Sequence, residues 1–96
     1  MKIYVVMGET GEYADYQEWI VHAYVDPTEA QKHADAAQQA FCSLVPGWNP
    51  GENEGIPFQR YLELGAFKNP YDPDGQLDYT GVRYGVVEVP VSEKFR

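Results

Sequence analysis

The chain has 96 residues, which suffices for one small domain spanning residues 1–96 and excludes a second independent core. Fifteen acidic residues against seven basic ones give a net charge of −8, so the chain repels phosphate backbone and direct nucleic-acid binding is not expected. Apolar residues make up 44% of the chain and aromatic residues 15%, which is typical of a folded domain and not of a disordered tail.

Cysteine content and the N-terminus bear on location. Cys42 is the only cysteine, which excludes an internal disulfide and fits a reducing compartment. The apolar run 3–7 is too short for a signal peptide core or a membrane span. The sequence therefore predicts a cytoplasmic protein that does not contact membranes.

The first two predicted elements are strands. Residues 2–7 are rich in β-branched and aromatic side chains and are apolar on both faces, which indicates a central strand. A loop with two glycines and three acidic residues follows at 8–16, and alternation resumes over 18–25. This pattern predicts an antiparallel hairpin. Strict alternation in its second strand places on opposite faces the two sets Trp19, Val21, Ala23, Val25 and Ile20, His22, Tyr24.

A helix is predicted from residue 27. Asp26 suits the N-cap, Pro27 the first helical position, and Glu29 the third position of a capping box. An apolar stripe then recurs at helical spacing through Ala30, Ala34, Ala37, Phe41 and Leu44. Pro46 and Gly47 end the helix, and the Gly/Pro-rich segment 46–57 is expected to be an exposed loop.

The C-terminal half alternates turns with short elements. Residues 58–67 have spacing that favours a short helix, and 69–81 form turns throughout. Residues 82–91 read as the last strand, whose end Pro90 places at a sheet edge. We predict an α+β fold: a three-stranded antiparallel sheet of order 2-1-3, with the amphipathic helix on one face and a loop-rich or short-helix segment before the last strand.

Aromatic side chains of the strands are expected on the sheet face opposite the helix. That face would carry Tyr4, either Tyr24 or Trp19, and Tyr84. Either a second layer from residues 46–81 or a partner protein would then cover it.

Acidic residues interleaved with tyrosines form the strongest candidate site. If the loops near residues 9–18 and 71–79 converge at one end of the sheet, they present negative charge around aromatic anchors, as many protein interfaces do. The predicted contact residues are Glu9, Glu12, Tyr13, Asp15, Tyr16, Glu18, Tyr71, Asp72, Asp74, Asp78 and Tyr79. The alternative interpretation is a solvated surface that only keeps the protein soluble.

Other chemistry is hard to assemble from this sequence. Residues 72–78 resemble part of a calcium loop, but the expected bidentate glutamate is missing, and we predict no metal site. His33 and Cys42 lie nine residues apart on the predicted helix, on roughly opposite sides, so they form no nucleophile–base pair. No cofactor is expected, and an enzyme would need His22, Asp78 and Tyr79 to meet in a cleft.

Two segments carry a resemblance. KIYVVMGETGEYADYQEW near the N-terminus and NPYDPDGQLDYTGVRYGVVEV near the C-terminus resemble small proteins of bacteriophage genomes and related mobile elements. No functional residue carries over from that group. The resemblance implies an accessory phage product acting in the bacterial cytoplasm, and small acidic proteins of that kind often inhibit host defence or nucleic-acid enzymes, including CRISPR effectors.

The leading hypothesis is a non-enzymatic binding protein that inhibits a nucleic-acid-handling host or defence protein by occupying its basic surface. An anti-CRISPR inhibitor would be one example. The alternative is a protein that binds a small molecule or nucleotide signal and stacks a base on Tyr or Trp side chains. A homodimer through the edge strand that ends at Pro90 is also open.

Overall fold

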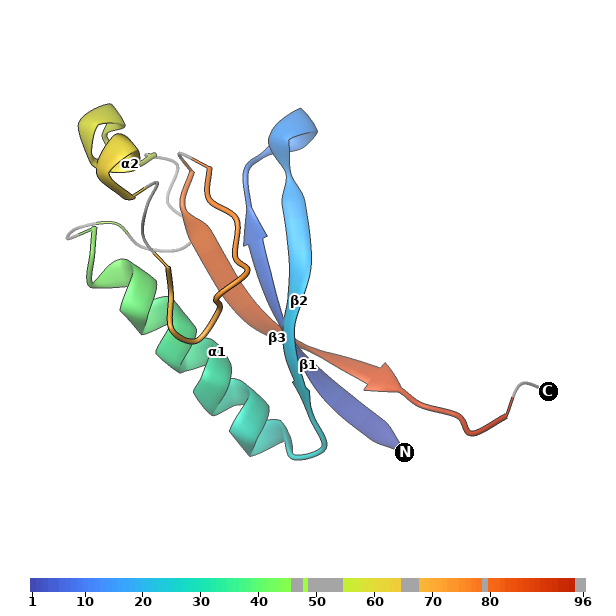
Figure 1. Ribbon diagram of the computed structural model, residues 1–96. Coiled ribbons are helices and arrows are strands. Elements are labelled where there is room, and N and C mark those ends of the chain that lie inside the picture. The colour runs from blue at the N-terminus through green and yellow to red at the C-terminus, as the bar shows by residue number, and fades with distance from the viewer. Residues whose placement is uncertain (46–47, 49–54, 65–67, 79, 95–96) are drawn as a thin grey trace.

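The computed structural model describes residues 1–45, 48, 55–64, 68–78 and 80–94. Its elements are β1 (Lys2–Thr10), the 3₁₀ turn η1 (Tyr13–Asp15), β2 (Gln17–Tyr24), α1 (Pro27–Cys42), α2 (Phe58–Leu64) and β3 (Val82–Pro90). The strands form a sheet of order β2-β1-β3 in which β1 is antiparallel to both neighbours (Figure 1). The predicted α+β fold is thereby confirmed, including the single main helix and the short helix before the last strand.

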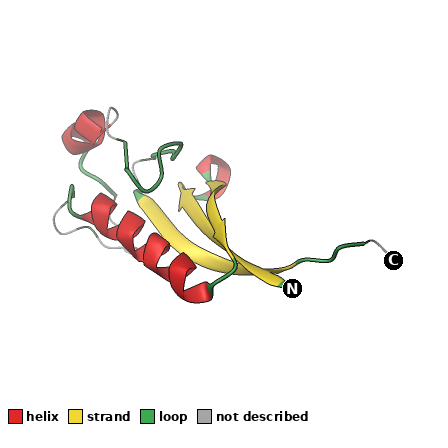
Figure 2. Cartoon of the chain, turned by 60° about the horizontal axis from the view of Figure 1, so that its bottom comes forward, coloured by secondary structure: helices red, strands yellow, loops and turns green. Residues whose placement is uncertain are grey.

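Helix α1 begins where the capping residues predict. The Asp26 carboxylate accepts a hydrogen bond from the Thr28 backbone N–H at 2.8 Å, and Pro27 occupies the first turn. The buried stripe consists of Ala30, Ala34, Ala37 and Phe41. Because most of these side chains are methyl groups, the helix axis lies close to the sheet, as Figure 2 shows from below.

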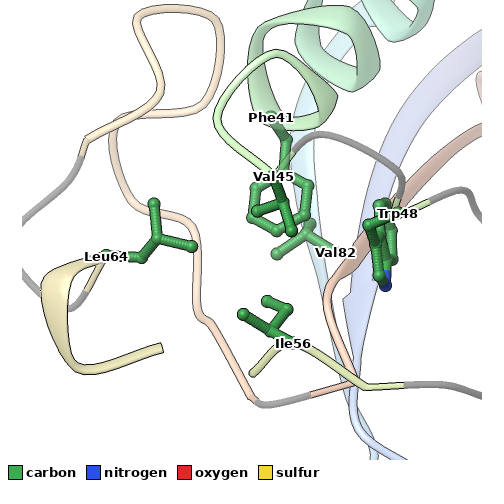
Figure 3. Packing of buried hydrophobic residues seen from close by; sticks show 6 residues of the cluster. All are labelled: Phe41, Val45, Trp48, Ile56, Leu64 and Val82. Atoms are coloured by element: carbon green, nitrogen blue, oxygen red, sulfur yellow. The ribbon is translucent and has the colours of Figure 1, made fainter. Parts of the chain in front are cut away.

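Two clusters of buried side chains make up the core. Val6 of β1 packs with Ala30 and Ala34 under the helix. The second cluster lies at the C-terminal end of α1 and joins residues from four parts of the chain: Phe41, Val45, Trp48, Ile56, Leu64 and Val82 (Figure 3). Trp48, Ile56 and Leu64 therefore extend the layer that contains α1. Residues 46–47 and 49–54 of the predicted loop and residues 65–67 lie outside the described residues.

The expectation that the strand aromatics face away from the helix is wrong. Tyr4, Tyr24 and Tyr84 pack against the cluster under α1, and Trp19 packs against the second cluster. The small alanines of α1 leave space that aromatic rings from the sheet fill. The described residues of segment 46–81 form no layer on the sheet face opposite α1.

A β-bulge in β2 explains why strict alternation fails there. Val6 pairs with His22 and Met7 pairs with Ile20, so Val21 is the extra residue. The bulge changes the phase of β2, and Trp19 and Tyr24, which alternation places on opposite faces, both contact the helix layer. His22 is exposed.

None of the helices that the structure describes is long and apolar enough to cross a membrane.

Candidate functional site

The two acidic segments meet at the end of the sheet where β1 and β2 join. The Thr10 hydroxyl donates to the Gly81 carbonyl at 2.7 Å and accepts from the Asp78 N–H at 2.9 Å. The Gly11 N–H donates to the Thr80 hydroxyl at 2.8 Å. The segment before β3 therefore lies beside the β1–β2 connection, and Figure 1 shows the orange chain next to the blue hairpin.

A hydrogen-bonded network occupies the base of this hairpin. We call it the hairpin network; it contains Glu9, Tyr16, Glu18 and Arg83. The Tyr16 hydroxyl donates to Glu9 Oε2 at 2.6 Å and to Glu18 Oε2 at 3.1 Å. The Arg83 guanidinium donates to Glu9 Oε1 at 3.1 Å and to the Gly11 carbonyl at 3.1 Å. Arg83 offsets the negative charge of Glu9, whereas Glu18 has only the hydrogen bond from the Tyr16 hydroxyl.

The network shifts two pKa values in opposite directions. The hydrogen bond to Glu9 is the main cause that raises the pKa of Tyr16, because a phenolate beside two carboxylates is unfavourable. The hydrogen bond from Tyr16, with a smaller contribution from Arg83, lowers the pKa of Glu9. At neutral pH Glu9 is therefore ionised and the Tyr16 phenol is neutral.

The tip of the hairpin, residues 12–15, projects beyond the network. Glu12, Tyr13 and Asp15 are all exposed, and Tyr13 is 95% exposed. Tyr13 has φ = 54°, in the left-handed region that non-glycine residues rarely adopt. Backbone hydrogen bonds from Asp15 N to Glu12 O and from Tyr16 N to Tyr13 O hold this turn. The tip therefore presents an aromatic ring between two carboxylates.

Asp72 does not belong to any exposed acidic surface, and its predicted place there is wrong. Its side chain is buried, and Oδ2 accepts hydrogen bonds from Trp19 Nε1 at 2.9 Å and from the Tyr84 hydroxyl at 2.7 Å. Burial, with a further contribution from Asp72, raises the pKa of Tyr84. Asp72 joins β2, β3 and the turn before β3, so its role is structural.

The remaining predicted residues of the second segment are dispersed. Tyr71 lies against α1, where its carbonyl accepts a hydrogen bond from His33 Nε2 at 2.7 Å. Asp74 is exposed on the turn after Asp72. Asp78 lies at the hairpin through its backbone N–H. Tyr79 lies outside the described residues. The structure therefore gathers at the hairpin Glu9, Glu12, Tyr13, Asp15, Tyr16, Glu18 and the backbone of Asp78.

Arg83 is the site residue that the sequence analysis missed. It is the only basic residue of β3, and antiparallel pairing places it opposite Glu9. The order of the strands was predictable, but the register was not, so nothing indicated which carboxylate Arg83 would meet.

A ring cluster on the helix side was also unforeseen. His22 stacks on His33 with ring centroids 5.6 Å apart. The Tyr24 hydroxyl lies 2.7 Å from His33 Nδ1. Because the Tyr71 carbonyl only accepts, Nε2 of His33 carries a proton and donates it to that carbonyl. The enzyme alternative needs His22 and Asp78 to meet in one cleft. His22 pairs with Val6 on β1, whereas the Asp78 N–H binds Thr10, four positions farther along the same strand. The two positions on β1 are therefore roughly 13 Å apart.

A cavity of about 260 Å³ lies between α1, the turn after Lys68 and β3. Its lining includes Phe41, Leu77 and Tyr84 together with the Asp72 side chain. Drug-sized ligands usually occupy about 300–1,000 Å³, so this cavity suits only a small molecule. Among the described residues, no three His, Cys, Asp or Glu side chains are grouped so that they hold a metal ion.

Comparison with family models, curated proteins and solved structures finds no match to the chain. The functional argument therefore depends on the geometry of the site.

Proposed function

We propose that this is a non-enzymatic binding protein whose hairpin tip docks on a basic surface of another protein. The observation that carries the proposal is Tyr13, which is 95% exposed and has φ = 54° between two exposed carboxylates. A strained backbone that displays an aromatic ring to solvent does nothing for the packing of this domain. Strain of this kind is concentrated at functional positions, and tyrosine is enriched among residues that dominate binding energy.

Charge supports a basic partner. Glu12 and Asp15 at the tip and Glu18 at the base of the hairpin are exposed, and the whole chain carries a net charge of −8. Complementary charge accelerates association and makes binding sensitive to salt. A protein surface that binds phosphate backbone offers the matching positive field. The proposed partner is therefore a nucleic-acid-handling protein of the bacterial host, with CRISPR effectors as one class, and the proposed location is the bacterial cytoplasm, in line with the resemblance to phage proteins.

Affinity capture from bacterial lysate, followed by binding measurements with the captured protein, tests the proposal. Tyr13→Ala and the charge reversal Glu12→Lys with Asp15→Lys should each abolish capture. The matched control is Glu29→Lys with Glu93→Lys, which changes the net charge equally at exposed positions outside the hairpin. Equal capture by the tip variants and the wild type would refute docking through the tip. Equal loss of capture in the control variant would show that the effect comes from net charge alone.

A small-molecule binder is the second candidate, and the cavity beside Asp72 is the observation that favours it. The Asp72 carboxylate in the cavity lining repels phosphate groups, so the ligand would be a small neutral or cationic molecule and not a nucleotide. Thermal shift with a panel of nucleotides and small amines separates the candidates, since a ligand that binds the folded state raises Tm.

A further inference from the structure

The face of the sheet opposite α1 is apolar and hollowed. We call it the open face; its residues are Ile3, Val5, Met7, Ile20, Ala23, Gly85, Val87 and Val89, with Glu9, Glu18 and Arg83 at the end near the hairpin. It forms a groove of about 700 Å³ whose lining residues all come from the three strands. Ile20 is 70% exposed and Val87 is 50% exposed, so large aliphatic side chains face solvent there.

The strand register divides the open face into rows of three residues. One row contains Ile20, Met7 and Gly85, in the order β2, β1, β3. A Cβ atom on Gly85 would meet nothing within 4 Å, so the β3 end of this row is open space while its β2 end carries a protruding Ile20. The row therefore has a protruding side chain at its β2 edge and an empty space at its β3 edge.

The two neighbouring rows show the same kind of asymmetry. Ala23, Val5 and Val87 form the next row, with a small side chain on β2 and a large one on β3. At the hairpin end the row is Glu18, Glu9 and Arg83, with a negative charge on β2 and a positive charge on β3. In these three rows the β2 position thus complements the β3 position in size or in charge.

We propose that the open face binds a second copy of this chain, in a dimer whose two-fold axis runs along β1 between the two sheets. This axis lays β2 of each copy over β3 of the other. Ile20 then enters the space above the partner's Gly85, Val87 packs on the partner's Ala23, and Glu18 faces the partner's Arg83. Each contact occurs twice, as a two-fold interface requires. Two sheets packed face to face form the aligned arrangement of β-sandwiches.

Because the open face is complementary to itself, a second copy of the chain fits it better than other occupants do. An amphipathic helix or a lipid surface would match the aliphatic rows but would not reproduce the size match of Ile20 with Gly85. It would also lack charges that complement Glu18 and Arg83, which within one chain bond Tyr16 and Glu9. The face is small: three strands about 4.8 Å apart and seven residues of about 3.3 Å each give a flat footprint of roughly 330 Å² per copy, below the roughly 800 Å² per partner of a standard interface. The dimer is therefore weak and transient and forms only at high protein concentration.

Salt distinguishes this association from docking on a basic partner. Two copies of net charge −8 repel each other, and added salt screens that repulsion while apolar burial persists. Self-association should therefore strengthen with salt, whereas partner capture should weaken. Tyr13 lies outside the open face, so either proposal can fail alone.

Analytical ultracentrifugation of the full chain from about 1 μM to about 1 mM tests the dimer. We expect a reversible monomer–dimer equilibrium at moderate salt. Gly85→Glu and Ile20→Glu should each weaken it about tenfold or more, because a charge would be buried against aliphatic side chains. Leu62→Glu, at an equally exposed aliphatic position on α2, should leave it unchanged. A monomer at every concentration, or equal loss in Leu62→Glu, overturns the proposal.

Folding of the variants is checked separately. Gly85 has open space for a side chain and Ile20 is exposed, so circular dichroism should report native melting for both variants as monomers. The conservative variant Gly85→Ala should melt like the wild type and weaken the dimer less than Gly85→Glu. If Gly85→Glu folds and still dimerises like the wild type, the interface is elsewhere.

Crosslinking tests the axis. In a Cys42→Ser background, Ile20→Cys and Gly85→Cys are made as separate chains and mixed with a bis-maleimide of about 10 Å reach, the spacing of packed sheets. The mixture should crosslink. Ile20→Cys alone should not, because the partner's Ile20 lies two strands farther across. Preferential crosslinking of Ile20→Cys to itself refutes the axis.

Discussion

Trp19 Nε1 donates a hydrogen bond to Asp72 Oδ2 at 2.9 Å, which joins the edge strand β2 to a turn 53 residues later in the chain. The same oxygen accepts from the Tyr84 hydroxyl on β3. One carboxylate thus connects both outer strands of the sheet with the loop-rich segment between α1 and β3.

Replacing Asp72 with Ala should therefore destabilise the protein. Two half-buried donors, Trp19 and Tyr84, would lose a charged acceptor, and hydrogen bonds to charged groups are worth about 1.5–3 kcal/mol each. We expect the free energy of unfolding in urea to fall by about 2–4 kcal/mol. Asp74→Ala removes an exposed carboxylate from the same turn and should change it by less than about 0.5 kcal/mol. Similar small losses in both variants would contradict a structural role for Asp72.

Tyr13→Gly should stabilise the fold and abolish partner capture. Glycine adopts φ = 54° without strain, so the free energy of unfolding should rise by about 0.5–1 kcal/mol, while the aromatic ring is lost. Tyr13→Ala keeps the unfavourable φ and should not gain this stability. Chemical denaturation of both variants, beside the capture experiment, separates backbone strain from binding. Capture retained by Tyr13→Gly would show that the ring is dispensable.

Glu9 should make stability depend on pH in the acidic range. Its pKa in the folded protein is lowered from the ordinary value of 4.5, so its stabilising effect is fully present above that value and is lost as pH falls through the lowered pKa. The destabilisation caused by Glu9→Gln at pH 7 should accordingly shrink at lower pH. Tyr16→Phe removes the main cause of the shift and should move the acid transition toward higher pH. An identical acid transition in Tyr16→Phe would contradict the hydrogen bond from Tyr16.

An added methyl group should be costly at Gly81 and close to neutral at Gly85. Gly81 has φ = +86°, and a Cβ there would lie 2.1 Å from the Trp48 ring, so Gly81→Ala should destabilise the fold by more than about 1 kcal/mol. Trp48 belongs to the second core cluster, and its fluorescence should report the disturbance. Gly85→Ala adds the same methyl group to open space on β3 and should be close to neutral for the monomer. Equal effects at both positions would contradict the packing of Trp48 on Gly81.

Local signals explain what the sequence predicted well. Asp26 and Pro27 mark the start of α1 because capping depends on neighbours a few residues away, and the alanine stripe follows from helical spacing alone. The hairpin acids Glu9 and Glu18 are close in the chain and remain together in space.

Long-range partners explain what the sequence did not predict. The burial of Asp72 depends on donors from β2 and β3, and a Pro-Asp-Gly turn alone indicates only an exposed loop. The pairing of Arg83 with Glu9 depends on strand register. The bulge at Val21 has no signature in the alternation pattern, and without it Trp19 and Tyr24 cannot share a face.

The extra residue in β2 also decides which face of the sheet each half of that strand presents to the helix. Val21 separates an outer half that supplies Trp19 to the Asp72 hydrogen bond from an inner half that supplies Tyr24 to His33. If Val21 instead paired regularly with Met7, the outer half would turn over, so that the indole would face water and Ile20 would point at the helix. Deleting Val21 removes the extra residue itself and should leave Trp19 and Tyr24 on the same face.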